Sequence, residues 1–596
     1  MSAATRAPAR FGVHLAADAS WAATSRLDGD AVTVELWERD GATFTPRPTP
    51  LAVEPVDQLV PTTGRRLLIC GGGGSRHTVW TVDCATLTRT RLTTRAGQAV
   101  RLLAPAPGDP DRRPWVLAYD GTRTTLARLV THGPTPTAVI ALPGAYTGGV
   151  WTDRAGRRLG LGRSRSGEPH TAVEVDLVTG ADRTLFEVTG HSNDTLQAWH
   201  PGAGLGVVHT DVGGVQRLGY ARPGRGERWA FPDDLAAPDG LVEAVAVDPD
   251  GHRILAHERR GVRSLLHRYD VVRHRRDTLA VPPGALAGRP VWTRRRLVVP
   301  WTTPRVPLTF LDLGPAGDRP ADTDTDAGSG PRWEARVVTV PGAAGPIEAI
   351  AYGGDRWWQR PRVVVALHGG PSSAWQLAYH PFFAQLAAEG VAVLAINPRG
   401  SVGYGHAFAA AIRTGWGGPD LDDVLAVGRH LRALRGDGSG VALVGSSYGG
   451  FLALLAAAAG PRLWQRCAAV APFSSAARLH RQAEPTVRRM IEQLGGLTDP
   501  PHAGLGPRDL LRLGHRTRAP ILLLHGRHDE QIPVGHVREL AAALVAARGP
   551  AVRYREYDVG HDVDGPTAWD AIADFLREPH HDPVVREQGH LDHADA

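Results

Sequence analysis

The sequence predicts an α/β domain over residues 335–577, preceded by an all-β domain over residues 1–330. Three observations predict this division. First, 596 residues are too many for one hydrophobic core, so two large domains are expected. Second, short β-type runs alternate with Gly, Asp and Pro turns through the first 330 residues, without long helical periodicity. Third, residues 441–450 place a strand, a sharp turn and the start of a helix in direct succession.

The N-terminal half reads as a series of strands and turns. Residues 244–255 form one such unit, a strand followed by an Asp-Pro-Asp-Gly turn and a second strand. Similar units recur about every 40–50 residues, a period typical of propeller blades, and about seven of them fit between residues 10 and 330. No unit carries a sharp blade signature, so a large β-sandwich or two smaller β domains stay open as alternatives. The clearest strand candidates are residues 65–70, 78–82, 115–119, 207–210, 241–247 and 297–301.

A linker and a tail bound the C-terminal domain. Residues 314–332 are rich in Asp, Thr, Gly and Pro and nearly free of large apolar groups, so they are expected to be a loop or linker. Residues 346–352 then read as the first strand of the C-terminal domain. The tail 578–596 is expected to be disordered and solvated. Its four histidines lack a fixed ligand spacing, so no metal site is expected there.

A nucleophile elbow is the most informative pattern in the chain. Residues 441–444 are an apolar run that suits a buried strand, and residues 451–459 are Ala- and Leu-rich, as in a buried helix. Between them, Gly445 to Gly449 fits G-x-S-x-G, in which a strained turn exposes the central Ser447 above the sheet. A plain Gly/Ser turn between strand and helix is the alternative. The context favours an α/β-hydrolase domain with Ser447 as nucleophile.

A serine nucleophile needs a base and an acid that orients the base. In α/β-hydrolases these follow in the order Ser, Asp or Glu, His, each in a loop after a strand. Residues 520–524 and 552–557 are apolar or alternating strand candidates, and Asp529 and His561 come shortly after them. We therefore expect His561 to accept the Ser447 proton and Asp529 to orient the imidazole.

Other residues near these positions could compete for the same roles. His525 and His528 both precede the acid, which is the wrong order for the base. The acidic neighbours read as solvated loop residues. The acidic competitors are Glu530, Asp558 and Asp562.

Five sequence blocks in this half occur in a fixed order. They are HGGP at 368–371, NPRGSVGYG at 397–405, GSSYGG at 445–450, HGRHDEQIP at 525–533 and GH at 560–561. As a set they resemble the prolyl oligopeptidase family of serine peptidases, in particular its acylaminoacyl-peptidase and dipeptidyl-aminopeptidase-like branch. The resemblance covers about residues 335–577 and implies a β-propeller ahead of the hydrolase domain, which with the repeat pattern predicts a seven-bladed β-propeller.

The resemblance also implies an oxyanion hole. The backbone N–H of Tyr448 and the hydroxyl of Tyr404 match the two donor positions, and each such donor is worth about 10²–10³-fold in rate. We interpret His368, Gly369 and Gly370 as a wall of the active site, although G-G-P could also be a simple turn. Asp422 and Asp423, on an expected helix, are interpreted as capping or solvated acids.

Composition excludes several other classes. All 67 basic residues are Arg, so lysine chemistry is excluded, and a net charge of +6 without a basic block argues against nucleic-acid binding. No apolar run is long enough to cross a membrane, and the N-terminus lacks a signal-peptide core. Cys70, Cys84 and Cys467 are expected to be buried thiols, although the first two could pair. A cytoplasmic location, no cofactor and no metal are expected, and a homo-oligomer stays open.

The functional hypothesis is a serine hydrolase that cleaves short peptides or N-acylated amino acids through an acyl-enzyme, with the propeller selecting substrate size. Dipeptidyl relatives hold the substrate amino terminus with a Glu pair, and no Glu-Glu pair occurs in this chain. One alternative is an esterase, thioesterase or transacylase acting on a small acyl metabolite. Another is a propeller binding module with a non-catalytic hydrolase domain.

Overall fold

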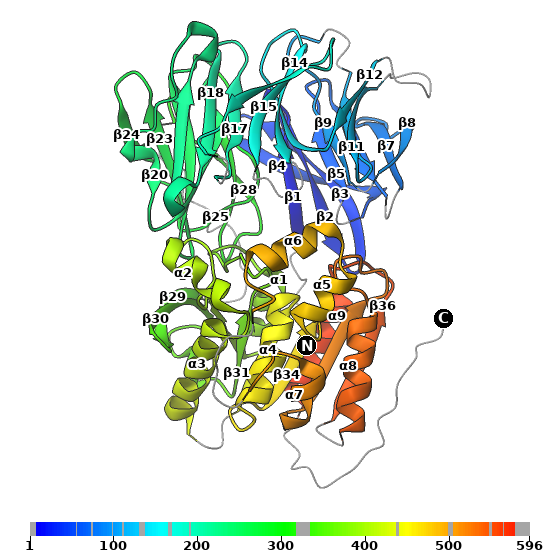
Figure 1. Ribbon diagram of the computed structural model, residues 1–596, viewed down its shortest axis with the longest axis vertical. Coiled ribbons are helices and arrows are strands. Elements are labelled where there is room, and N and C mark those ends of the chain that lie inside the picture. The colour runs from blue at the N-terminus through cyan, green and yellow to red at the C-terminus, as the bar shows by residue number, and fades with distance from the viewer. Residues whose placement is uncertain are drawn as a thin grey trace. The chain divides into compact units, whose positions relative to one another are not determined.

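The computed structural model describes residues 8–578 apart from several gaps. These gaps are 55–56, 73–75, 98, 110–112, 130–137, 165–169, 190–191, 318–333, 437–439, 499–504, 548–550 and 564. The described residues fall into two compact units, one within Ala7–Gly328 and one within Ser329–Ala596 (Figure 1). Most of the linker expected at 314–332, and all of the tail beyond Glu578, lie outside the described residues.

The N-terminal unit consists of four-stranded antiparallel sheets, and the described residues form seven of them. Each sheet uses consecutive strands from one continuous segment, which is the organisation of a seven-bladed β-propeller. The predicted fold class is therefore confirmed for this half, and the sandwich alternative is wrong.

The strands of the seven sheets are β1 (Ala9–Leu15), β2 (Trp21–Asp28), β3 (Ala31–Asp40) and β4 (Thr43–Ala52); β5 (Gln58–Pro61), β6 (Arg66–Gly71), β7 (Arg76–Asp83) and β8 (Arg89–Ala96); β9 (Ala99–Leu103), β10 (Trp115–Tyr119), β11 (Arg123–Arg128) and β12 (Ala138–Pro143); β13 (Ala145–Trp151), β14 (Arg158–Ser164), β15 (Thr171–Asp176) and β16 (Asp182–Phe186). They continue with β17 (Thr195–His200), β18 (Leu205–Thr210), β19 (Gln216–Ala221) and β20 (Ala236–Ala237); β21 (Leu241–Val247), β22 (Arg253–Arg260), β23 (Arg263–Asp270) and β24 (Arg275–Thr278); β25 (Ala285–Leu286), β26 (Val291–Trp292), β27 (Leu297–Thr302) and β28 (Thr309–Asp312).

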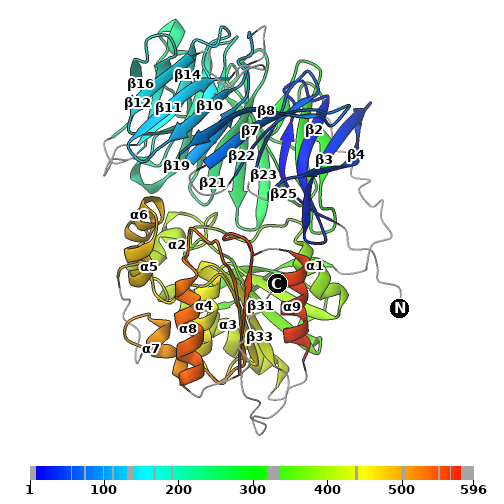
Figure 2. The ribbon, with the colours of Figure 1, turned by 90° about the vertical axis from the view of Figure 1, so that its right-hand side faces the viewer.

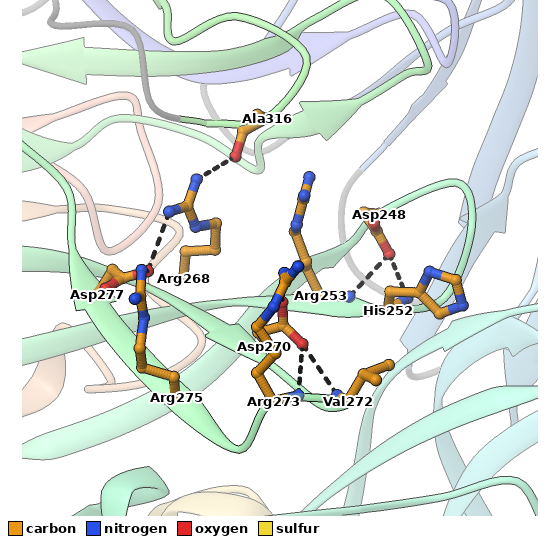
Figure 3. A network of polar contacts seen from close by, with 10 residues as sticks. All are labelled: Asp248, His252, Arg253, Arg268, Asp270, Val272, Arg273, Arg275, Asp277 and Ala316. Carbon is orange, nitrogen blue, oxygen red and sulfur yellow. Dashed lines mark hydrogen bonds and ion pairs between the residues drawn. The ribbon is translucent and has the colours of Figure 1, made fainter.

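The sixth sheet shows why the Asp-containing turns join these strands. Between β21 and β22, one oxygen of Asp248 accepts the N–H groups of His252 at 2.7 Å and Arg253 at 2.9 Å. Between β23 and β24, Asp270 accepts the N–H groups of Val272 and Arg273 in the same way (Figure 3). A short acidic side chain thus satisfies turn donors that no strand partner reaches. The strand–turn–strand prediction at 244–255 is confirmed.

The first and last blades meet through side chains and through one isolated backbone bridge between Val13 and Gly288. No described strand of one blade joins the other blade's sheet. Instead the Arg39 guanidinium of β3 lies 2.7 Å from Asp312 Oδ2 of β28, and the rings of Trp37 and Phe310 pack edge to face at 5.3 Å. Arg296 of the last blade also donates to the Gly41 carbonyl oxygen at 3.0 Å. The ring is therefore closed by packing, polar side-chain contacts and one isolated backbone bridge rather than by a shared strand.

The C-terminal unit is built on one eight-stranded sheet in the order β29-β30-β32-β31-β33-β34-β35-β36. From β32 to β36 neighbouring strands run parallel, whereas β29, β30 and β32 pair antiparallel. Strands such as β32 (VAVLAI) are buried at every residue, because helices cover both faces of a parallel sheet. The strands are β29 (Ala335–Gly342), β30 (Gly345–Tyr352), β31 (Arg362–Leu367), β32 (Val391–Ile396), β33 (Val441–Ser446), β34 (Arg466–Val470), β35 (Ile521–Gly526) and β36 (Val552–Tyr557).

One strand expectation was wrong. Residues 346–352 do form a strand, within β30, but β29 precedes it as the first strand of this sheet. Only Val340 of β29 is fully buried, so this edge strand carries little hydrophobic signal in the sequence.

Helices cover both faces of the sheet. In Figure 2, α1 and α9 lie on one face, and α3, α4 and α8 lie on the other. Helix α4 is apolar on every side, which its burial beneath the sheet explains. The α-helices are α1 (Pro381–Ala388), α2 (His406–Ala410), α3 (Pro419–Arg435), α4 (Tyr448–Ala459), α5 (Ala476–Gln482), α6 (Pro485–Gln493), α7 (Leu510–Leu513), α8 (Gly535–Ala546) and α9 (Pro566–Arg577). Short 3₁₀ turns lie at Val212–Gly214, Pro223–Arg225, Asp233–Leu235, Trp357–Gln359, Ala411–Thr414 and Gly514–Arg516.

Asp423 of α3 is not a solvated acid, and that expectation was wrong. Its side chain is fully buried and forms an ion pair with Arg399. It also accepts the backbone N–H of Ala343 at 2.8 Å and of Arg399 at 2.9 Å. Burial raises the pKa of this carboxyl against the lowering effect of these donors. Asp423 thus connects α3 both to the β29–β30 turn and to the loop that follows β32.

We expect Asp423→Ala to lower the free energy of unfolding of the C-terminal unit by about 3 kcal/mol, because it strands a largely buried guanidinium and two backbone donors. Denaturant unfolding followed by tryptophan fluorescence measures the effect. Asp422→Ala, a half-buried neighbour in the same helix, is the control and should cost about 1 kcal/mol or less. Equal effects of the two substitutions would contradict this role of Asp423.

Candidate active site

The elbow around Ser447 is strained in the way its motif requires. Ser447 has φ 56° and ψ −120°, a conformation that non-glycine residues rarely adopt. A Cβ on Gly445 would lie 2.2 Å from the Gly449 carbonyl oxygen, and a Cβ on Gly449 would lie 2.4 Å from the Leu367 carbonyl oxygen. Both glycines are therefore needed for the sharp turn between β33 and α4. Ser447 is partly exposed at the carboxyl edge of the sheet.

Tyr448 begins α4, so its N–H belongs to the first turn, where no intrahelical acceptor exists. Its side chain is buried, and the hydroxyl donates a hydrogen bond to Asp420 of α3. Burial, opposed by this hydrogen bond, raises the pKa of Asp420 to about 6. The Tyr448 ring also packs edge to face on Trp416 at 5.0 Å. These contacts fix the residue whose N–H is the first expected oxyanion donor.

Asp529 and His561 are in direct contact. Asp529 follows β35 and His561 follows β36, and these neighbouring parallel strands end at the same edge as β33. His561 Nδ1 lies 2.7 Å from Asp529 Oδ2. Burial alone would raise the pKa of Asp529, but hydrogen bonds from His525 and His561 outweigh it and hold the pKa well below its usual range. Asp529 is therefore an ionised carboxylate in direct contact with the His561 ring.

The acidic competitors of Asp529 all point to solvent. Glu530, Asp558 and Asp562 are exposed, whereas the Asp529 side chain is fully buried. Asp558 pairs instead with the exposed His528 at 2.7 Å. Burial thus separates the acid that contacts His561 from its sequence neighbours.

The HGGP segment after β31 lies beside the elbow. A Cβ on Gly369 would be 3.5 Å from Ser447 Cβ, so the Gly369 backbone faces the serine closely. Gly370 has φ 125°, a conformation suited to glycine. His368 is buried with Nε2 2.8 Å from Ser401 Oγ, and burial lowers its pKa to about 4. The segment forms a neutral, closely packed border next to Ser447.

Tyr404 is held by two polar partners. Its hydroxyl donates to Glu348 Oε2 at 2.9 Å and accepts from Asn397 Nδ2 at 2.7 Å. Asn397 also accepts the Trp375 N–H and donates to the Trp375 carbonyl oxygen. A phenol carries one proton, so Tyr404 can donate to an oxyanion only by releasing Glu348.

Several residues of this region escaped sequence reasoning. Glu348 lies in β30, Asn397 follows β32 and Asp420 lies in α3, and nothing near them in sequence indicates their partners. The sequence did show the block that contains Asn397 and a helix in the region of Asp420. Their contacts with Tyr448 and Tyr404 depend on how distant segments pack.

The fold and this arrangement define the class of the C-terminal unit as an α/β-hydrolase, as the sequence predicted. Residues 378–576 match the prolyl oligopeptidase family. This match confirms the resemblance seen in the sequence for that part of the chain.

Characterised and uncharacterised relatives align over part of this region. A peptidase from Bacillus subtilis named YuxL is 32% identical over 184 residues, which is 30% of this chain and 28% of the relative. The acylamino-acid-releasing enzyme of Rattus norvegicus is 30% identical over 200 residues, or 32% of this chain and 27% of the relative. The chain thus spans little more than a quarter of these relatives' length in the alignments.

Solved structures share the fold over nearly the whole chain. The acylaminoacyl peptidase of Pyrococcus horikoshii superposes with a TM-score of 0.72 at 14% identity, covering 96% of both chains. A puromycin hydrolase superposes with a TM-score of 0.73 at 18% identity, covering 96% of this chain and 94% of that one. At these identities the likeness establishes the fold alone.

None of the helices in the described part of the chain has the length and apolar character needed to cross a membrane.

Proposed function

We propose that this protein is a serine hydrolase that cleaves short peptides or N-acylated amino acids through an acyl-enzyme intermediate. The observation that carries the proposal is the 2.7 Å contact between His561 and Asp529, at the sheet edge where the strained Ser447 is exposed. Nucleophile, base and orienting acid then come from the ends of three parallel strands, as in other α/β-hydrolases.

The chemistry assigns one role to each residue. His561 Nε2 takes the proton of Ser447 Oγ as that oxygen attacks the carbonyl carbon of the substrate. The tetrahedral oxyanion is stabilised by the Tyr448 N–H and a second donor. His561 then gives its proton to the leaving amine, and the acyl group stays on Ser447. Water, deprotonated by His561, releases the acid and restores Ser447.

The substrate class rests on relatives. The matched proteins include acylamino-acid-releasing enzymes and a dipeptidyl aminopeptidase, and the fold is that of acylaminoacyl peptidases. The absence of a Glu-Glu pair favours N-acylated or oligopeptide substrates over strict dipeptidyl release. Selection of short substrates by the propeller, and a cytoplasmic location, are further parts of this proposal.

Tyr404→Phe tests the second oxyanion donor. If the Tyr404 hydroxyl turns from Glu348 to the oxyanion, its loss should lower kcat by about 10²-fold with little change in KM, because the bond forms only in the transition state. Steady-state kinetics with an N-acyl amino acid amide measure this.

An unchanged kcat in Tyr404→Phe would remove Tyr404 from the oxyanion hole. The Gly369 backbone, which lies against Ser447, would then be the nearest structural candidate. A raised KM at constant kcat would make Tyr404 a substrate-binding residue.

A fluorophosphonate probe followed by peptide mapping tests the proposed function as a whole. We expect a single adduct on Ser447 in the full chain. A panel of N-acyl amino acid amides, dipeptide amides, simple esters and thioesters then identifies the leaving group, and a folded protein substrate should stay intact. Exclusive ester or thioester turnover would favour the small-metabolite hydrolase. No adduct and no turnover would favour a binding module.

A further inference from the structure

Two buried histidines lie behind the proposed catalytic acid and have no part in the chemistry above. His525 is the penultimate residue of β35 and is 0% exposed, and His536 in the first turn of α8 is 3% exposed. The sequence excluded His525 as the base because it precedes Asp529. Its contacts give it another role.

Geometry determines the tautomer of His525. Its Nε2 lies 2.9 Å from the Ile532 carbonyl oxygen and 3.2 Å from Asp529 Oδ2. Both oxygens can only accept, so Nε2 carries the proton, and Nδ1 of the neutral ring is an acceptor. That Nδ1 is buried and has no hydrogen-bond partner among the described residues.

The hydrogen bonds of His536 determine its tautomer as well. Its Nδ1 receives the backbone N–H of Ser474 at 3.3 Å, so the proton of the neutral ring is on Nε2. This Nε2 is likewise buried without a partner in the described part of the chain. Burial is the main cause that lowers the pKa of His536 to about 4. The electrostatic effects of His525, Arg478 and Arg481 contribute in the same direction, and the charge of Asp509 acts in the opposite direction. His536 is therefore neutral, and its ring adds no positive charge beside His525.

The carboxylate of Asp529 divides its contacts between its two oxygens. Oδ1 accepts the backbone N–H groups of Gln531 at 2.9 Å and Ile532 at 2.8 Å. Oδ2 accepts from His561 at 2.7 Å and lies 3.2 Å from His525 Nε2. His525 is thus the second imidazole on the oxygen that orients His561.

We propose that His525 is a positioning residue for Asp529, kept in its Nε2–H tautomer by the Ile532 carbonyl oxygen. The inference rests on the proposed function, in which Asp529 orients His561. His525 fixes the rotation of the carboxylate and takes up part of the negative charge on Oδ2. Without this donor, Oδ2 would stabilise protonated His561 more strongly. As the pH is lowered, His561 would then become protonated, and activity would be lost, at a higher pH than in the wild type.

The test compares His525→Leu, which removes the donor, with His525→Gln, whose amide can replace Nε2–H. His528→Gln is the matched control, because His528 is exposed on the same loop. We expect His525→Leu to lower kcat by about 10–100-fold at similar KM, the value of a hydrogen bond to an ionised group. The acid limb of kcat/KM against pH should move to higher pH. His525→Gln should recover most of the loss, and His528→Gln should match the wild type.

A purely structural role would give a different result. If His525→Leu and His525→Gln lose activity equally, in proportion to the folded fraction and with an unmoved acid limb, the inference is overturned. Nitrogen NMR of ¹⁵N-histidine-labelled wild-type protein is a second test that needs no activity. We expect one buried imidazole in the Nε2–H tautomer, assigned by its loss in His525→Gln. The opposite tautomer would overturn the inference.

These measurements separate the two proposals. A wild-type protein without fluorophosphonate labelling or turnover would refute the proposed function. The NMR result would still decide the tautomer of His525 on which the inference depends.

Discussion

Ser447→Ala should abolish turnover, with kcat lowered by at least about 10⁴-fold while the protein stays folded. The reason is that Ser447 Oγ is the proposed nucleophile, held at the elbow's turn where Ser447 adopts φ 56°. Alanine has no oxygen to form the acyl-enzyme, and residual rate would come only from binding and the oxyanion donors. Initial rates with an N-acyl amino acid amide and the melting temperature, measured on the same preparation, test this.

Ser446→Ala is the matched control. Ser446 is the exposed neighbour at the end of β33, and its removal should leave kcat near the wild-type value. The fluorophosphonate adduct should vanish in Ser447→Ala and persist in Ser446→Ala. The reverse pattern would show that Ser446 is the nucleophile.

Asp529→Asn should lower kcat by about 10⁴-fold through the wrong tautomer of His561. The backbone donors of Gln531 and Ile532 require an acceptor at the Oδ1 position, so the new amide must place its NH₂ at Oδ2. His561 Nδ1 then faces a donor and must accept. Its proton moves to Nε2, which can no longer take the proton of Ser447. The measurement is kcat over pH 5–9, where the loss should persist at every pH.

Substitution of the neighbouring acids provides the control for this prediction. Glu530→Gln and Asp558→Asn change exposed side chains that lie outside the buried contact with His561. Both should leave kcat close to that of the wild type. If either proved as damaging as Asp529→Asn, the assignment of the acid would be wrong.

Local patterns predicted the strands and the elbow because their causes are local. The continuous apolar run at residues 441–444 marks a strand buried on both faces, and the steric demands of a sharp turn fix Gly445 and Gly449. The blade turns were also predictable, because Asp248 satisfies N–H groups only four and five residues away. Strand β29 was missed, since an edge strand with a single buried residue has no strong pattern.

Residues whose roles depend on distant partners could not be interpreted in the same way. Asp423 looked like a surface acid, yet it is fully buried against Arg399 and the turn after β29. Tyr404 matched an oxyanion position by resemblance, but its hydroxyl is bonded to Glu348, 56 residues earlier in the chain. Residue type and spacing give no information about such contacts.

The sequence by itself determined the two fold classes, the family of the C-terminal domain and the order of the candidate residues Ser447, Asp529 and His561. Only the tertiary structure decided which acid contacts His561, which partners hold Tyr404, and that His525 lies behind Asp529. The physical reason is the parallel sheet. It brings the ends of strands that are far apart in sequence to one edge, and burial there selects one carboxylate while its sequence neighbours stay in water.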